Sequence, residues 1–355
     1  MVVLGVDVHK DTHTTVAVDE VGREIGCKTV KARDRGHAAL VRWARTENPD
    51  EQRVWAIEDC RHVSTRLERA LLAAGERVVR VPPKLMAGAR ASARTRGKSD
   101  PIDALAIARA ALREPNLPAA EHDRTSRELK LLVDHREDLV TERTRMQSRV
   151  RWHLHELDPD LDIPSRGLDR FCVLDRLLAW LEGHGPAAES VVVARIATEL
   201  LVDIRAVTVR INALERELTR LAEQAAPQLQ ALSGVAGLTA AKIIGEAANM
   251  SRFRSEACFA MHAGVAPIPA SSGRTNRHRL ARGGNRQLNA ALHRIAVTQA
   301  RMPDSLGHAY YQRRIAMGNT KMEALRALKR RLARVVFNLL AAPKSSTTGH
   351  QPVAA

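Results

Sequence analysis

The first 113 residues alternate between short apolar segments and helical patterns in an order that strongly limits the possible folds. Three strand-like runs with tight connections come first, which predicts an antiparallel meander. Helices and strands then alternate, and a last helix opens after Pro101, a residue suited to the first helical turn. The expected strands are residues 2–8, 14–19, 24–30, 53–57 and 77–81, and the expected helices are residues 37–45 and 64–74. This order, βββαβαβα, predicts a ribonuclease-H-like α/β domain.

Two acidic residues lie at the ends of apolar strands. Asp7 interrupts the run from Val2 to Val8, and Glu58 directly follows Val-Trp-Ala-Ile. A carboxylate in such a run would be buried, and a buried charge needs a metal ion or a basic partner to offset the loss of water. A lone strand aspartate is more often a surface residue, so each acid is a weak signal by itself.

Asp100 and Asp103 open the helix around Pro101, and their i, i+3 spacing places both on one face. Helix capping is the simpler interpretation, because acids favour helix N-termini, and Asp100 could serve both roles. Taken with the two strand-end acids, the pair predicts one cluster of four carboxylates. Four converging acids repel one another unless divalent cations lie between them. We therefore expect Mg²⁺ (or Mn²⁺), which can stabilise the oxygens of a phosphodiester displacement.

The charge of the chain is concentrated near its C-terminus. The net charge is +16, which favours a polyanionic partner held through its phosphates. From Ala270 to Leu340 there are 15 lysines and arginines against two acids, so this segment carries +13 of the +16. Such concentration indicates a binding face. Aromatic residues make up only 3%, which argues against recognition based mainly on base stacking.

A heptad-like pattern predicts long helices in the middle of the chain. Apolar residues recur over 129–157, although Arg136 and Arg143 interrupt the seam, and 158–186 breaks the pattern with three prolines. A cleaner repeat follows. It comprises Val193, Ile196, Leu200, Ile204, Val207, Ile211, Leu214, Leu218, Leu221 and Ala225. The helices could form a dimerisation arm or pair within one chain, and both could hold.

A glycine-containing turn opens the C-terminal part. Residues 232–241 look like a helix-hairpin-helix turn, whose backbone at Gly234 and Gly237 would grip a phosphate. A plain turn between two helices is the alternative interpretation.

An arginine-rich loop rich in Pro, Ser and Gly follows within residues 263–286. Its cations are Arg274, Arg277, Arg279, Arg282 and Arg286. Cations can stabilise an ionised hydroxyl and a pentavalent phosphorus, so a serine here could be a nucleophile. Composition alone does not distinguish Ser271 or Ser272 from ordinary turn residues.

The four cysteines lie far apart without a Cys-x-x-Cys pair, which argues against a zinc site or a disulfide framework and fits a reducing cytoplasm. The first ten residues lack the pattern of a signal peptide, and no run approaches the roughly 20 apolar residues of a membrane span. We therefore expect a cytoplasmic protein without a membrane partner.

These motifs together resemble the DEDD transposases of the insertion sequence 110 family. The matching pieces are collinear over residues 1 to about 340. They are Gly5–Lys10, Ile57-Glu58, Gly97–Ala104, Gly234–Ala241, Arg252-Phe253, Ala263–Pro267, Ser272-Gly273, Gly284-Asn285 and Tyr311. The chain departs from many members at Asp59-Cys60-Arg61, and its stretch from Ser272 to Gly284 is slightly shorter than in some relatives.

The resemblance implies a RuvC-like nuclease domain, a coiled coil and a C-terminal transposase domain. It places the catalytic and metal-binding acids on Asp7, Glu58, Asp100 and Asp103. It places the nucleophile on Ser272, which would form a covalent phosphoserine link with DNA. It also implies a structured bridge RNA as guide and a homo-oligomer, a dimer or a tetramer, acting on the bacterial chromosome.

The expected division of the chain has four parts and a polar linker at 114–125. They are a nuclease domain at 1–115, a helical coiled-coil region at 124–226, a mostly α-helical transposase domain at 227–340 and a disordered tail at 341–355.

Three other functions compete with this one. A Holliday-junction-type nuclease would use the acids alone with water, and would leave the Ser-Gly loop unexplained. A non-catalytic nucleic-acid-binding protein would not need four intact acids. A sugar-kinase-like ATPase would need glycine-rich phosphate loops in two repeated halves, and none is visible in the sequence.

Overall fold

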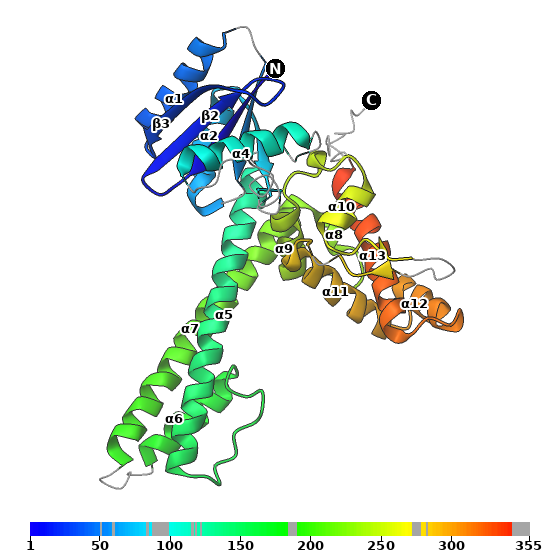
Figure 1. The fold of residues 1–355 in the computed structure, drawn as a ribbon. Helices are drawn as coiled ribbons and strands as arrows, with labels where there is room; N and C mark the ends of the chain where they lie inside the picture. The colour runs from blue at the N-terminus through cyan, green and yellow to red at the C-terminus, as the bar shows by residue number, and fades with distance from the viewer. Residues whose placement is uncertain are drawn as a thin grey trace, which may run out of the picture. The chain divides into compact units, whose positions relative to one another are not determined.

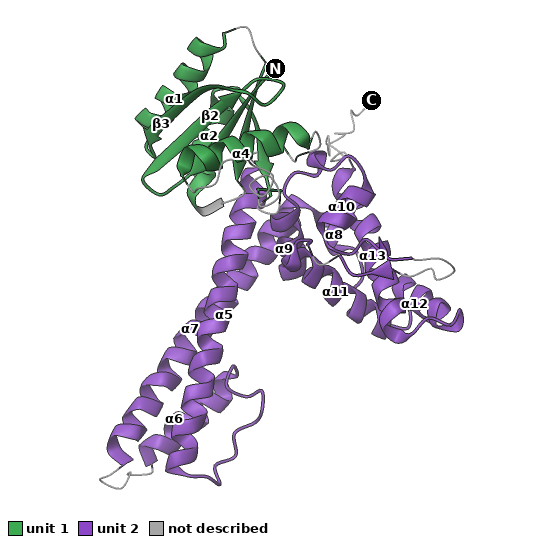
Figure 2. Ribbon diagram, in the orientation of Figure 1, with its two compact units in different colours: residues 1–122 green, residues 123–355 purple. Residues whose placement is uncertain are grey.

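The computed structural model describes residues 1–49, 52–58, 61–82, 85–86, 99–114, 117, 119–120, 123–183, 190–271, 278–281 and 283–342, with the backbone alone at 61 and 62. The chain forms two compact units, Met1–His122 and Asp123–Ala355 (Figure 2).

A five-stranded mixed sheet forms the centre of the first unit (Figure 1). Its strand order is β3-β2-β1-β4-β5. The first three strands pair antiparallel, whereas β4 pairs parallel with both β1 and β5. Parallel neighbours need crossover connections, and helices supply them here. The strands are β1 (Val2–Val8), β2 (Thr12–Val18), β3 (Glu24–Lys31), β4 (Arg53–Glu58) and β5 (Arg77–Val81).

Helices cover both faces of this sheet. α1 (Asp34–Glu47) and α2 (Arg61–Ala73) share one apolar core with Leu4 and Trp55. α4 (Asp100–Arg113) shares a second core with Val3 and Ala56, the side chains that alternate to the opposite face. Every residue of β1 is buried, as expected for a central strand covered on both sides. The predicted mixed α/β fold is confirmed, and its strand order is the ribonuclease-H-like one.

The expected polar linker at 114–125 packs in part against the sheet. Ala119 forms a β-bridge with Val79, and the buried Ala120 donates its backbone N–H to the carbonyl of Val78. The polar composition of the segment did not reveal this contact, because two small alanines carry it.

Two long antiparallel helices, α5 (Arg124–Leu157) and α7 (Val191–Ala225), run side by side in the second unit (Figure 1). Between them in sequence lies α6 (Phe171–Gly183), whose Leu174 and Leu177 pack in one core with residues of both long helices. The segment 158–186, expected only as a break, therefore contains a helix. Two of its prolines, Pro159 and Pro164, precede α6, where they do not interrupt the helical hydrogen bonds.

The two arginines that interrupt the apolar seam of α5 face polar residues of α7. The Nε of Arg136 lies 3.0 Å from Glu215 Oε1, and Arg143 donates to Thr208 Oγ1 at 3.2 Å. The buried stripe of α7 is Ala197, Leu200, Leu201, Ile204, Thr208, Ile211, Leu218 and Ala222.

The seam thus includes polar positions that were absent from the predicted apolar repeat. Val207 and Leu214, which were part of that repeat, lie half-buried at the edge of the seam. Polar pairs in the seam favour one register, because a shift would separate Arg136 from Glu215 and the buried Thr208 from Arg143. The coiled-coil geometry and a dimerisation role stay predictions.

The remaining helices pack around one end of this helical pair. Leu129 of α5 and Leu218 of α7 belong to the same apolar core as Ile243, Phe259 and Ile295. The predicted division at residue 227 stays a prediction. The elements are α8 (Pro227–Gln230), α9 (Gly237–Ala247), η2 (Met250–Arg252), α10 (Glu256–His262), β6 (Ile268–Pro269), β7 (His278–Arg279), α11 (Arg286–Arg301), α12 (Leu306–Ala316) and α13 (Lys321–Ala341). Within the described ranges, every helix is too short or too polar to span a lipid bilayer.

A buried glutamate ties several elements of the first unit together. Glu76, just before β5, is 6% exposed and accepts a hydrogen bond from Trp55 Nε1 at 3.0 Å. Arg45 and Arg53 also donate to it, at 3.0 and 3.2 Å. Burial raises the pKa of Glu76, but the hydrogen bonds from Trp55, Arg53 and Arg45 outweigh burial and hold the pKa below its usual value.

We predict that Glu76→Gln lowers the free energy of unfolding at neutral pH by roughly 2 kcal/mol, because charged hydrogen bonds are lost. The pKa of Glu76 is lower in the folded than in the unfolded chain. Its contribution is therefore complete above the unfolded value, about 4.3, and is lost as pH falls through the folded value. Urea unfolding of both proteins between pH 7 and pH 3 measures the difference. Glu47→Gln, an exposed change on α1, is the matched control. A stability difference that does not shrink below pH 4 would contradict the prediction.

Candidate active site

Asp7 and Glu58 lie at the carboxyl ends of the neighbouring parallel strands β1 and β4. Val6 pairs with Ile57 in the register, so Asp7 and Glu58 occupy equivalent positions one residue further on. Both side chains alternate away from the α1–α2 face and toward the face that α4 covers. Asp7 is 5% exposed, as its apolar neighbours led us to expect, and Glu58 is half-buried.

Gly5 allows α4 to lie directly on β1. A Cβ at position 5 would be 2.1 Å from the carbonyl oxygen of Ala104 and 2.4 Å from the amide nitrogen of Ala108. Both are backbone atoms of α4, so no side-chain rotation could relieve the clash. The glycine therefore determines how closely the first turn of α4 approaches the strand that carries Asp7.

The first turn of α4 brings two more acids to Asp7. Asp103 is 7% exposed, and Asp100 is half exposed beside it. His9 joins the group from the end of β1. Its Nε2 lies 3.0 Å from Asp7 Oδ2 and 3.5 Å from Asp100 Oδ1. The N-cap residue is Ser99, so neither acid is the cap itself, but both lie in the first turn of α4, where acids also suit the helix dipole.

His9 has a place in the site that sequence reasoning did not assign. It lies two residues after Asp7, so the alternation of an extended chain returns it to the same face. The two-residue spacing could have indicated that His9 belongs to the site. A histidine next to a strand end is common, however, so the spacing alone does not predict a functional role.

The environment of Asp7 disfavours a negative charge without a cation. Burial raises the pKa of Asp7, the imidazole of His9 lowers it, and the charges of Asp103 and Asp100 raise it again. The net pKa is above the usual value. A carboxylate in this setting is stabilised in its charged form by a nearby positive ion.

The residues present fit a divalent cation. One oxygen of Asp7, one oxygen of Asp100 and one nitrogen of His9 all lie within 4.8 Å of one another. Carboxylate oxygens suit magnesium and manganese, and an imidazole nitrogen suits transition metals. The donor set therefore fits a divalent-metal site.

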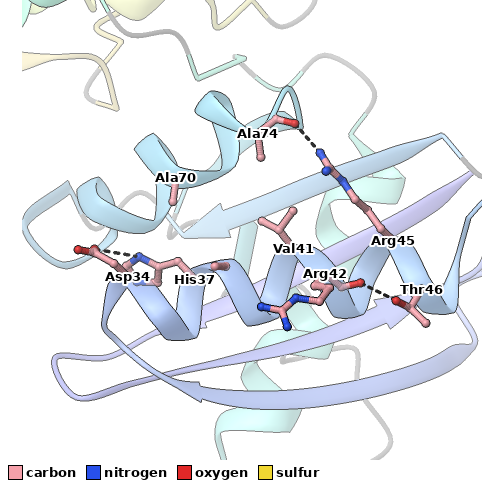
Figure 3. Close-up of a pocket in the computed structure, with 9 residues that line it drawn as sticks. Asp34, His37, Val41, Arg42, Arg45, Thr46, Ala70 and Ala74 are labelled. Carbon is pink, nitrogen blue, oxygen red and sulfur yellow. Dashed lines mark hydrogen bonds and ion pairs between the residues drawn. The ribbon is translucent and has the colours of Figure 1, made fainter.

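A separate hollow of about 600 Å³ lies between α1 and α2, on the face of the sheet opposite α4 (Figure 3). Its lining includes Asp34, Arg42 and the buried His37, which stacks on His13 at 5.3 Å between ring centroids. Burial lowers the pKa of His37, and burial together with His37 lowers the pKa of His13 to about 4. Both imidazoles are therefore neutral near pH 7. None of the described residues that line this hollow is a predicted site residue.

The loop predicted to carry the serine is only partly described. Ser272, Arg274, Arg277 and Arg282 lie outside the described residues. The described part comprises Ser271, the short strand pair β6–β7, which includes Arg279, and Arg286 at the start of α11. Ser271, Arg279 and Arg286 are all exposed.

The base of this loop is closed by a contact between two glycines. A Cβ on Gly284 would be 2.3 Å from the backbone of Gly264, which itself has a φ of +65°. Asn285 donates its backbone N–H to the carbonyl of His262. Its side chain caps α11 and donates to Glu246, which also accepts from Lys130 of α5 at 2.7 Å. The loop is thus anchored to both α9 and α5.

The two glycines of the predicted phosphate-binding turn have packing roles. Gly234 has a φ of +82°, which favours glycine. Gly237 is buried at the start of α9, where a Cβ would be 2.3 Å from Thr219 Oγ1 of α7. Helix packing explains Gly237 without a phosphate, so its nucleic-acid contact stays a prediction. The helix before the turn, α8, has only four residues.

Comparison with known families identifies the chain. A family model described as "Transposase" matches residues 4–159, and one described as "Transposase IS116/IS110/IS902 family" matches residues 226–312. A protein of insertion element IS110 from Streptomyces coelicolor is 30% identical over 296 aligned positions, which cover 68% of this chain and 70% of the relative. The chain belongs to the IS110 family of transposases. It is therefore a protein of DNA transposition.

Two other insertion-element proteins match over nearly their whole length. A 44.8 kDa protein of insertion element IS116 from Streptomyces clavuligerus is 28% identical, with 95% of this chain and 94% of the relative covered. A 42 kDa protein of insertion element IS900 from Mycobacterium paratuberculosis is 25% identical with the same coverage. Among solved structures, T. thermophilus RuvC in complex with a Holliday junction substrate matches at 18% identity and a TM-score of 0.25. The match covers 32% of this chain and 94% of that one.

We predict that Gly5→Ala abolishes DNA cleavage by displacing α4, and with it Asp100 and Asp103, from Asp7. Overpacking against backbone should also lower the free energy of unfolding by about 1–3 kcal/mol. Cleavage of labelled DNA and thermal unfolding measure the two effects. The control is Gly183→Ala, where a Cβ meets nothing within 4 Å, and it should leave both unchanged. Wild-type cleavage by the Gly5→Ala protein would show that the approach of α4 is not required.

Proposed function

We propose that this transposase binds, cleaves and rejoins DNA with a carboxylate site in its first unit and a serine nucleophile in its second. The observation that supports it most is the convergence of Asp7, Asp100 and Asp103 at one end of the sheet in a chain of a transposase family. Acids so placed would serve no purpose in a protein that only packs or only binds phosphates.

The four acids Asp7, Glu58, Asp100 and Asp103 would hold Mg²⁺ (or Mn²⁺). Such an ion, when bound, supplies positive charge to the oxygens of a phosphodiester during its displacement. Asp7 is held by His9, which fixes the direction of the carboxylate through the 3.0 Å hydrogen bond. The low exposure of Asp7 and Asp103 keeps water away from half of the cluster.

Ser272 would attack the phosphorus of a DNA strand. Its oxygen forms a bond to phosphorus as the bond from phosphorus to one deoxyribose oxygen breaks. The serine hydroxyl gives up its proton in this step, and the departing deoxyribose oxygen takes up one proton. Gly273 has no side chain to hinder the approach of the phosphate. Arg274, Arg277, Arg279, Arg282 and Arg286 would stabilise the charge that develops there.

The same proposal includes partners. Family resemblance suggests a structured bridge RNA that selects the DNA, and a homo-oligomer in which the serine of one protomer works with the acids of another. The paired helices α5 and α7 offer an exposed surface for such an assembly, since Val202 and Val209 lie seven residues apart on α7 and are half exposed. The domain limits at residues 115, 226 and 340 belong to this proposal too.

We predict that Asp7→Asn and Asp103→Asn each reduce strand cleavage by roughly 100-fold or more, because each removes a charge that the metal needs. Binding of DNA should stay near wild type, since phosphate contacts come from basic residues elsewhere. Cleavage of labelled DNA with Mg²⁺, with Mn²⁺ and with EDTA measures the loss. Asp138→Asn, an exposed change on α5, is the control. Undiminished cleavage in EDTA, or by either variant, would rule out the metal site.

We predict that Ser272→Ala retains DNA binding and loses strand exchange, because the change deletes the nucleophile and no charge. Ser271→Ala should keep most activity. Denaturing electrophoresis of labelled DNA traps the covalent adduct, and mass spectrometry maps the modified peptide. An adduct on Ser271, or recombination by the Ser272→Ala protein, would overturn the assignment. Metal-dependent cleavage without any adduct would favour a junction-resolving nuclease that uses water.

A further inference from the structure

A basic hollow of about 810 Å³ lies in the second unit, between α12, α13 and the strand pair β6–β7. Its lining includes Arg279 of β7, Arg314 of α12, and Arg326, Lys329 and Arg330 of α13. Glu323 is the acid among the described lining residues. The hollow therefore has a large excess of positive charge.

The lining cations lack enough carboxylates to neutralise them. Glu323 is engaged in the capping box of α13, where it accepts from the backbone and the hydroxyl of Thr320. Arg330 is paired with Glu256 at 3.2 Å. In the part of the chain that the structure describes, Arg279, Arg314 and Arg326 have no carboxylate within salt-bridge distance.

Two of the cations that line the hollow are partly shielded from water. Lys329 is half-buried and donates to the neutral Asn289 Oδ1 at 2.9 Å. Burial, followed by the charge of Arg326, lowers the pKa of Lys329. The Nε of Arg314 is buried and has no hydrogen-bond partner among the described residues. Donors in this state gain most from an anion, because the cost of desolvating them has already been met.

The position of the hollow relates it to the serine loop. Gly264–Pro267 and His278–Ala281 line it, and these are the segments on either side of Ser271 in the chain. An anion held between α12 and α13 would thus lie against the stem of that loop, whose base is closed by the Gly264–Gly284 contact.

We infer that this hollow binds a backbone phosphate of the DNA strand on which the serine loop acts, with Arg314, Arg326 and Lys329 as its charge partners. The inference rests on the proposed function, because a strand held here is useful only to a nucleophile nearby. It adds helices α12 and α13 to the DNA-binding surface. Arg guanidinium groups form paired hydrogen bonds with phosphate oxygens, and a lysine adds a point charge.

The test is the salt dependence of DNA binding, measured by fluorescence anisotropy in an Asp7→Asn background so that cleavage during the measurement is suppressed. The probe is a labelled duplex of arbitrary sequence, since phosphate contacts carry no sequence information. Arg314→Gln with Arg326→Gln should reduce the slope of log K against log [salt] by up to about 1.8, or about 0.9 for each lost contact. Arg313→Gln with Lys321→Gln is the matched control. It removes the same charge from exposed positions on the same two helices, outside the lining, and should leave the slope unchanged.

Three outcomes would overturn the inference. They are an unchanged slope, an equal reduction by the control pair, and a reduction seen with single-stranded RNA of equal length but not with DNA. If the double variant unfolds, Arg326→Gln alone should reduce the slope by about 0.9, because Arg326 is exposed and its loss does not disturb packing. Failure of the proposed serine chemistry would give a different result. The wild-type protein would then bind DNA without forming a covalent adduct, and the difference in salt slope between the variants would remain.

Discussion

The direct contact of α4 with β1 is the constraint on which the acidic site depends. Side chains normally separate a helix from the sheet on which it packs. Gly5 has no side chain, and the residues of α4 that face it, Ala104 and Ala108, are small, so the two backbones lie in contact. The first turn of α4 can then bring Asp100 and Asp103 to Asp7, across more than ninety residues of sequence. The same closeness buries Asp7 among other acids and raises its pKa, so the contact that assembles the site also creates its need for a cation.

In the second unit, a helical framework holds a polar, arginine-rich loop. Glu246 accepts hydrogen bonds from Lys130 of α5 and from Asn285, the residue that caps α11 directly after the loop. The Gly264–Gly284 contact closes the loop at its base. Along α5 and α7, polar pairs such as Arg136–Glu215 favour one register of the two helices. Buried polar groups thus position the loop, and apolar packing supplies most of the stability.

Charge is divided between the two units in a way that suits a phosphodiester substrate. The first unit brings acids together at one site, where they repel DNA unless cations neutralise them, and the second unit carries most of the net positive charge. Membership of the IS110 transposase family indicates that both units act on DNA. The proposed metal and serine are refinements of that assignment and depend on separate residues, whereas the proposed guide RNA rests on family resemblance.

The sequence by itself determined the order of strands and helices in the first unit, the candidate acids and the basic C-terminal segment. The first follows from the hydrophobic periodicity of each segment, the second from acids within apolar runs, and the third from the number of lysines and arginines relative to acids. Tertiary structure alone decided which side chains meet. It added His9 to the acids, placed polar Thr208 and Glu215 in the seam of α7 and revealed α6 within the segment that was expected only as a break. It also set Arg314 and Arg326 around one hollow. Sequence spacing specifies a face of one element, whereas these contacts join faces of different elements, and only the packed chain brings those together.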